Sequence, residues 1–119
     1  MNDFRIMARI LAAVKQCEKD QGMDVALFDP RVLKTDEKSR DALIVKLQRE
    51  GYVDGFFLVE DKDSQPYPVV MLGVSNPQIT IKGMTFIEEN KPLKKAIEEL
   101  KDAVVSVASN KLTNGLFML

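Results

Sequence analysis

Histidine and tryptophan are absent from this sequence of 119 residues, and Cys17 is its single cysteine. One cysteine excludes an intramolecular disulfide, and the absence of histidine removes the usual ligands of a zinc site and the usual base of a catalytic relay. Cys17 falls on the apolar stripe of a predicted helix, so we interpret it as a small buried side chain rather than a reactive thiol. We expect no metal, no cofactor, no catalytic residues and a protein that is not an enzyme.

An excess of one charge and a long apolar run are also missing. The sequence has 17 basic and 18 acidic residues, a net charge of -1, so no global field attracts it to DNA or to anionic lipid. The first nine residues, MNDFRIMAR, carry charges inside their apolar pattern, which predicts neither a signal peptide nor a membrane span. We expect a cytoplasmic protein without a membrane partner, folded as one domain over residues 1–119.

Apolar residues recur with helical spacing in several segments. The pattern predicts helices over residues 3–19, 81–89 and 92–109, and a further helix that starts at a cap on Thr35 or Asp36 and runs to Glu50. Asp29-Pro30 predicts a short helix through about Leu33. Residues 110–119 are apolar but contain Asn114-Gly115, so we expect a tail that packs on the core or on another chain.

Two short segments about thirty residues apart outline the fold. In LQREGYV (47–53) Gly51 stands where a helix ends and a strand begins, and in ITIKG (79–83) Thr80 can cap a new helix. Between them, β-rich runs at 56–59 and 67–72 flank a polar turn and predict a hairpin. We predict an α+β fold, a winged helix with its core at about 3–90 and a C-terminal helical extension.

The succession LQREGYVDG, a hairpin, ITIKGMTFIEEN and then PLKKAIEELKDAV resembles the YjcQ family of small bacterial and phage-borne proteins. The resemblance covers about residues 3–103. It implies a winged-helix-like fold and a phage or prophage setting, and it carries over no catalytic or binding residues. The long hairpin with Pro66 and Pro68, and the tail after Ser109, depart from the family pattern.

In a winged helix the third helix, ending at Glu50, would be the recognition helix. Leu43, Ile44 and Leu47 form its inward stripe, so at 100° per residue the opposite face is predicted to carry Lys38, Asp41, Val45, Gln48 and Arg49. The segment from Arg31 to Arg49 contains six basic and three acidic residues, a local net charge of +3. We therefore predict binding of double-stranded DNA, with Arg49 and Gln48 suited to base edges, and name as candidate DNA-binding residues Lys38, Lys46, Gln48 and Arg49.

A protein-interaction module is the alternative function, because the predicted hairpin tip carries Glu60, Asp61 and Asp63 against one lysine and would approach phosphates with the wrong charge. One of Phe56 and Phe57 must face outward if the hairpin alternates. The candidate partner-binding residues are Val45, Phe117 and Leu119, which would contact a host protein or a second copy in a homodimer.

Overall fold

The computed structural model describes the backbone of residues 3–60 and 68–117 and the side chains of residues 3–60 and 68–106. In this part of the chain five α-helices and two small antiparallel sheets form an α+β structure, as predicted. With η for a 3₁₀ helix, the order is α1 (Asp3–Lys19), η1 (Val25–Phe28), α2 (Pro30–Leu33), α3 (Glu37–Arg49), β1 (Val53–Asp54), β2 (Leu58–Val59), β3 (Val69–Val70), η2 (Leu72–Val74), β4 (Gln78–Ile79), α4 (Ile81–Glu89) and α5 (Lys91–Phe117).

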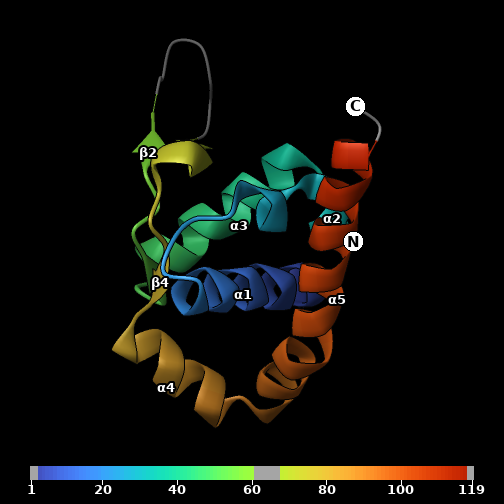
Figure 1. The fold of residues 1–119 in the computed structure, drawn as a ribbon. Coiled ribbons are helices and arrows are strands. Elements are labelled where there is room, and N and C mark those ends of the chain that lie inside the picture. Colours follow the sequence, from blue (N-terminus) through green and yellow to red (C-terminus); the bar gives the residue numbers. More distant parts are fainter. Residues whose placement is uncertain (1–2, 61–67, 118–119) are drawn as a thin grey trace.

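Helix α1 forms the centre of the structure. Figure 1 shows α3 on one side of it, α4 on the opposite side, and α5 running across the end at which α1 begins. Helix α1 packs most extensively against α5 and also contacts β4 and η1. Its buried positions include Ala8, Ala12 and Ala13, whose small side chains allow close helix packing. Cys17 is buried there too, as predicted, and its burial raises the pKa of the thiol.

Side-chain caps determine where α2 and α3 begin. The Asp29 carboxylate accepts a hydrogen bond of 2.9 Å from an N–H in the first turn of α2, with Pro30 as the first helical residue. Asp36 Oδ1 accepts one of 2.7 Å from the Ser39 N–H, and its hydrogen bonds with Ser39 lower the pKa of Asp36. The predicted Asp29-Pro30 start is confirmed, and Asp36 rather than Thr35 caps α3.

The chain from β1 to β4 forms a long hairpin with two strand pairs in succession, which rises beside α3 in Figure 1. At its base β1 pairs with β4, with Val53 opposite Ile79. Further along, β2 pairs with β3, with Leu58 opposite Val70. The predicted hairpin is therefore present, and residues 61–67, which contain its acidic turn, lie outside the described residues.

On the side toward β1 and β4, strands β2 and β3 stop short of the ends of the predicted runs at residues 56 and 72, because a side chain interrupts the ladder. Ser75 Oγ accepts a hydrogen bond of 3.0 Å from the Phe57 N–H and donates one of 2.8 Å to the Met71 carbonyl. A hydroxyl thus bridges two backbone groups that would otherwise pair directly. Regular pairing resumes only at β1 and β4.

Helix α5 continues past the predicted end near residue 109. Its described backbone is helical through Phe117, so the prediction of a separate tail beginning at residue 110 is wrong up to that point. Asn114 and Gly115 do not stop the helix, since a glycine inside a helix costs only about 1 kcal/mol relative to alanine. The side chain of Phe117, and the whole of Leu119, lie outside the described residues.

Candidate functional site

One exposed face of α3 carries three of the four residues predicted to contact DNA. Lys38, Lys46 and Arg49 lie on successive turns, with Ala42 between the two lysines, and all four residues are exposed. Spacings of four, four and three residues place them on one side of a helix. The structure therefore places Lys46 beside Lys38 and Arg49, the two cations of the predicted outward face, and the contact of all three with DNA stays a prediction.

Two residues of the predicted outward face are buried, so that part of the prediction is wrong. Val45 is 5% exposed and Asp41 is 3% exposed. Helix α3 is covered by α1 and α2 and also by strand β3. The covered part of α3 is therefore wider than its stripe of leucine and isoleucine indicates. Val45 accordingly belongs to the core and not to a free partner surface.

Asp41 forms a buried ion pair with its neighbour Arg40. Arg40 Nε lies 2.9 Å from Asp41 Oδ1, and Arg40 Nη1 donates a hydrogen bond of 3.0 Å to the Phe28 carbonyl. The second Asp41 oxygen accepts a hydrogen bond of 3.3 Å from the Val70 N–H of β3. The pair thus connects α3 to η1 and to the hairpin. Because Arg40 is buried in this pair, it does not belong to the exposed basic residues of α3.

Gln48 fixes the hairpin to α3 instead of facing outward. Its Nε2 donates a hydrogen bond of 2.9 Å to the Phe56 carbonyl, and its Oε1 accepts one of 2.9 Å from the Phe56 N–H. An adenine contact needs the same two amide atoms. Gln48 therefore drops out of the candidate DNA-binding residues.

Replacing Gln48 with alanine should lower the free energy of unfolding by about 1–3 kcal/mol, because two partly buried backbone groups of Phe56 lose their partners. Urea unfolding followed by circular dichroism measures this change. Gln78→Ala, at an exposed position on β4, is the matched control and should change the stability far less. Equal effects of the two substitutions would contradict this role of Gln48.

Arg49 makes the direct contact between the exposed face of α3 and the hairpin. Its Nη2 lies 2.6 Å from Glu60 Oε1, and both side chains are about half exposed, at 59% and 49%. Ion pairs exposed to this extent add little stability and exchange readily with water. Arg49 therefore remains available to another anion, although an acidic residue lies beside it.

The two segments that outline the fold in the sequence contact each other. Thr80 Oγ1 accepts a hydrogen bond of 2.9 Å from the Gly83 N–H, which confirms the predicted cap of α4. The same hydroxyl donates one of 2.5 Å to the carbonyl of Gly51. Gly51 has φ 84°, the left-handed conformation predicted for the end of α3. We call this contact the α3–α4 junction.

Lys82 completes the α3–α4 junction, a role that the sequence analysis did not predict. Its Nζ donates a hydrogen bond of 2.7 Å to the Glu50 carbonyl at the end of α3 and lies 5.1 Å from the centroid of the Tyr52 ring. The opposite charge of the helix end and the ring both favour an ammonium there. No local signal could reveal this, because the partners are some thirty residues apart.

A protein-family model described as YjcQ protein matches residues 8–104, which include the whole α3–α4 junction. The chain belongs to the YjcQ family. This confirms the resemblance drawn from the sequence motifs. No curated protein and no solved structure matches the chain.

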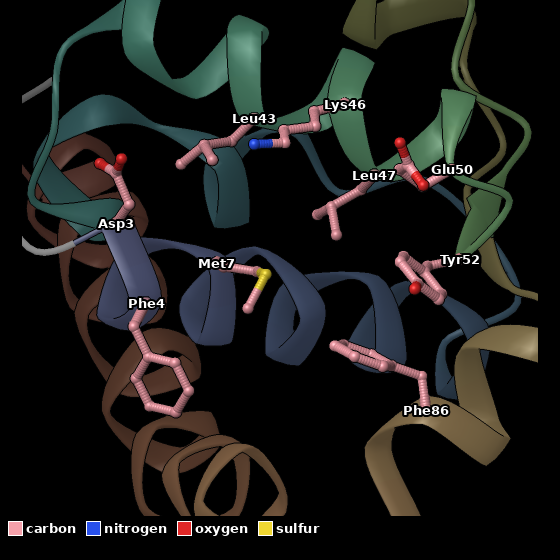
Figure 2. A pocket seen from close by; sticks show the side chains of 9 residues that line it. All are labelled: Asp3, Phe4, Met7, Leu43, Lys46, Leu47, Glu50, Tyr52 and Phe86. Carbon is pink, nitrogen blue, oxygen red and sulfur yellow. The ribbon is translucent and has the colours of Figure 1, made fainter. Parts of the chain in front are cut away.

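The protein also has an apolar groove between α1, α3 and α4, with a volume of about 340 Å³ (Figure 2). Six apolar or aromatic side chains and three charged ones line it: Phe4, Met7, Leu43, Leu47, Tyr52 and Phe86, with Asp3, Lys46 and Glu50. Tyr52 and Phe86 stack with their ring centroids 4.4 Å apart. No pattern in the sequence predicted this groove, because its lining comes from elements far apart in the chain.

The residues that the structure describes contain no group of three or more cysteine, aspartate or glutamate side chains placed to hold a metal ion. Their helices include none long and apolar enough to cross a membrane. The expectation that the protein is not an enzyme stays a prediction.

Proposed function

We propose that this YjcQ protein binds double-stranded DNA as a transcriptional regulator, through a winged-helix domain in which α3 is the recognition helix. The observation that carries the proposal is the exposed face of α3, where Lys38, Lys46 and Arg49 lie together. The order of elements supports it, because the short α2 precedes α3 and a hairpin follows, in the place of the wing. A regulator of this kind suits the phage or prophage setting that the family implies.

The dimensions of α3 and its support also favour this role. Its 13 residues form a helix about 20 Å long, and the major groove of DNA, about 12 Å wide, admits an α-helix. The contacts of Asp41 with Val70 and of Gln48 with Phe56 hold an adjoining side of α3 against the hairpin. On the exposed face, Ala42 is small enough for close approach to a thymine methyl group, while Arg49 suits guanine.

The charge balance predicts weak binding by a single copy. The net charge is -1, and Glu60 lies beside Arg49. Because phosphate neutralisation supplies most non-specific affinity, three exposed cations on α3 support only modest binding. A homodimer that presents two α3 helices to successive major grooves would bind more tightly.

Titration into random-sequence duplex DNA at low salt tests the proposal by fluorescence anisotropy. We expect salt-dependent binding that weakens in Lys46→Ala, with the slope of log K against log salt reduced by about 0.9 for the lost phosphate contact. Lys101 is an exposed lysine on α5, and Lys101→Ala should leave the affinity for DNA and the salt slope unchanged. Absence of binding by the unaltered protein at high micromolar concentration would overturn the proposal.

A second function, self-association as an interaction module, is favoured by the outward face of the hairpin. Phe57 and Met71 are 55% and 46% exposed, and Met71 N–H donates to the Phe57 carbonyl, so the two side chains are neighbours across the strands. Val59 lies on the same face. An apolar face of this kind can pack against its own copy around a two-fold axis.

Light scattering at high protein concentration tests this second function. We expect the mass of a dimer for the unaltered protein and that of a monomer for Phe57→Ser. Val25→Ser, which removes an exposed apolar side chain from η1, is the control and should remain dimeric. A monomeric unaltered protein would rule out self-association through the hairpin.

A further inference from the structure

We propose that Glu60 is a specificity-determining residue of the DNA interface, because it opposes contact of Arg49 with phosphate groups and leaves Arg49 to an uncharged base edge. This inference rests on the proposed binding of DNA by α3 and concerns the part of DNA that Arg49 contacts. It starts from the ion pair between α3 and the hairpin, in which Arg49 Nη2 lies 2.6 Å from Glu60 Oε1.

The hairpin holds the backbone of Glu60 beside α3 (Figure 1). Val59, the residue before it, is paired with β3. Earlier in the same segment, both amide atoms of Gln48 bond the backbone of Phe56, so the hairpin is attached to α3 directly before Arg49. The Glu60 carboxylate therefore stays close to Arg49 even when the exposed ion pair opens.

A phosphate group that binds Arg49 has to approach the Glu60 carboxylate as well. In water, two like unit charges about 4–7 Å apart repel each other enough to weaken binding about threefold to fivefold. The Debye length at physiological salt is about 8 Å, so salt screens this repulsion only in part. Glu60 thereby reduces the affinity that a phosphate contact of Arg49 would add.

A base edge carries no net charge, so Glu60 does not repel it in this way. Guanine presents two acceptors in the major groove, and arginine can donate to both. The guanidinium group has several N–H donors, and the contact with Glu60 is made through Nη2 of Arg49. Donors therefore remain for guanine, while the carboxylate restricts the orientation of the guanidinium plane.

Lys46 differs from Arg49 in this respect. Both cations line a hollow of about 320 Å³ between α3 and Pro68 of the hairpin, and Glu50 lines it too. Among the described residues, neither Lys46 nor Glu50 forms an ion pair. Because the lysine ammonium is a point charge suited to phosphate, we expect Lys46 to contact the DNA backbone and Arg49 to contact a base.

Fluorescence anisotropy with two duplex probes, poly(dG-dC) and poly(dA-dT), tests the inference at several salt concentrations. The unaltered protein should bind poly(dG-dC) roughly fivefold more tightly, near the lower end for one bidentate arginine contact. In Glu60→Gln, Arg49 gains a phosphate contact on poly(dA-dT). There the affinity should rise about threefold to fivefold, and the slope of log K against log salt should become steeper by about 0.9. The preference for poly(dG-dC) should fall accordingly.

Three controls separate this role from a general effect of charge. Glu88→Gln opens an exposed ion pair of 2.9 Å with Lys94, on the opposite side of α1 from α3, and should change neither affinity nor slope. Glu50→Gln removes a charge from the same hollow without a contact to Arg49, so it should raise the affinity for both duplexes equally. In an Arg49→Ala background, Glu60→Gln should leave the slope unchanged.

The inference is overturned if the unaltered protein binds DNA and Glu60→Gln changes neither the affinity for poly(dA-dT) nor the salt slope. It is also overturned if Glu60→Gln steepens the slope equally with and without Arg49. A different result, no binding of either duplex at high micromolar concentration by the unaltered protein and by Glu60→Gln, would overturn the proposed DNA binding itself and this inference with it.

Discussion

Replacing Gly83 with alanine is expected to lower the free energy of unfolding by about 3 kcal/mol, and Tm by roughly 10 °C. An added Cβ would lie 2.0 Å from the Tyr52 carbonyl oxygen and 2.8 Å from Ile79 Cγ2. The carbonyl cannot simply turn away, because it accepts a hydrogen bond of 3.1 Å from the Thr80 N–H. The whole first turn of α4 would have to move away from the end of α3.

Gly22→Ala is the matched control for this prediction. No atom outside its immediate neighbours lies within 4 Å of a Cβ at Gly22, so the extra methyl group should meet open space. Thermal unfolding of both variants by circular dichroism measures the difference in Tm. If Gly83→Ala melts at the temperature of Gly22→Ala, the α3–α4 junction does not form as described.

Replacing Asp41 with alanine is expected to lower the free energy of unfolding by about 3–5 kcal/mol, a large fraction of the about 5–15 kcal/mol that is usual for a native protein. The substitution removes the buried carboxylate that faces Arg40 at 2.9 Å, and the buried guanidinium would keep only a longer contact with the exposed Glu37. It also leaves the Val70 N–H of β3 without its acceptor. Chemical unfolding by urea measures the loss.

Glu37→Ala separates burial from charge in that experiment. Glu37 also approaches Arg40, at 3.8 Å, but its side chain is 72% exposed. Because water screens this pair, its removal should cost less than about 1 kcal/mol. A loss as large as that in Asp41→Ala would mean that charge alone, and not burial, accounts for the effect.

The interpretation of α3 was correct where it depended on contacts within the helix. Its cap, which the sequence placed at Thr35 or Asp36 and the structure at Asp36, and its left-handed end at Gly51 follow from hydrogen bonds that reach only a few residues along the chain. The same holds for Thr80, which caps α4. Helix caps of this kind depend on residues that are close together in the sequence, so the sequence was sufficient to predict them to within one residue.

The assignment of outward residues on α3 failed where it depended on the hairpin. Helical periodicity predicts one buried stripe on α3, formed by Leu43, Ile44 and Leu47. Strand β3 covers a second side of α3 and buries Asp41 and Val45. Gln48 is likewise directed to Phe56 by the hairpin that follows. These contacts join residues that a periodic pattern cannot relate.

The order of residue types was sufficient to predict the positions of the α-helices apart from the end of α5, the hairpin and the YjcQ family, because periodicity and capping residues act over short distances along the chain. The three-dimensional packing was needed to show which cations share the exposed face of α3, that Lys82 closes the α3–α4 junction, and that a groove lies between α1, α3 and α4. Burial and charge pairing depend on neighbours in space, and folding brings these neighbours from distant parts of the chain.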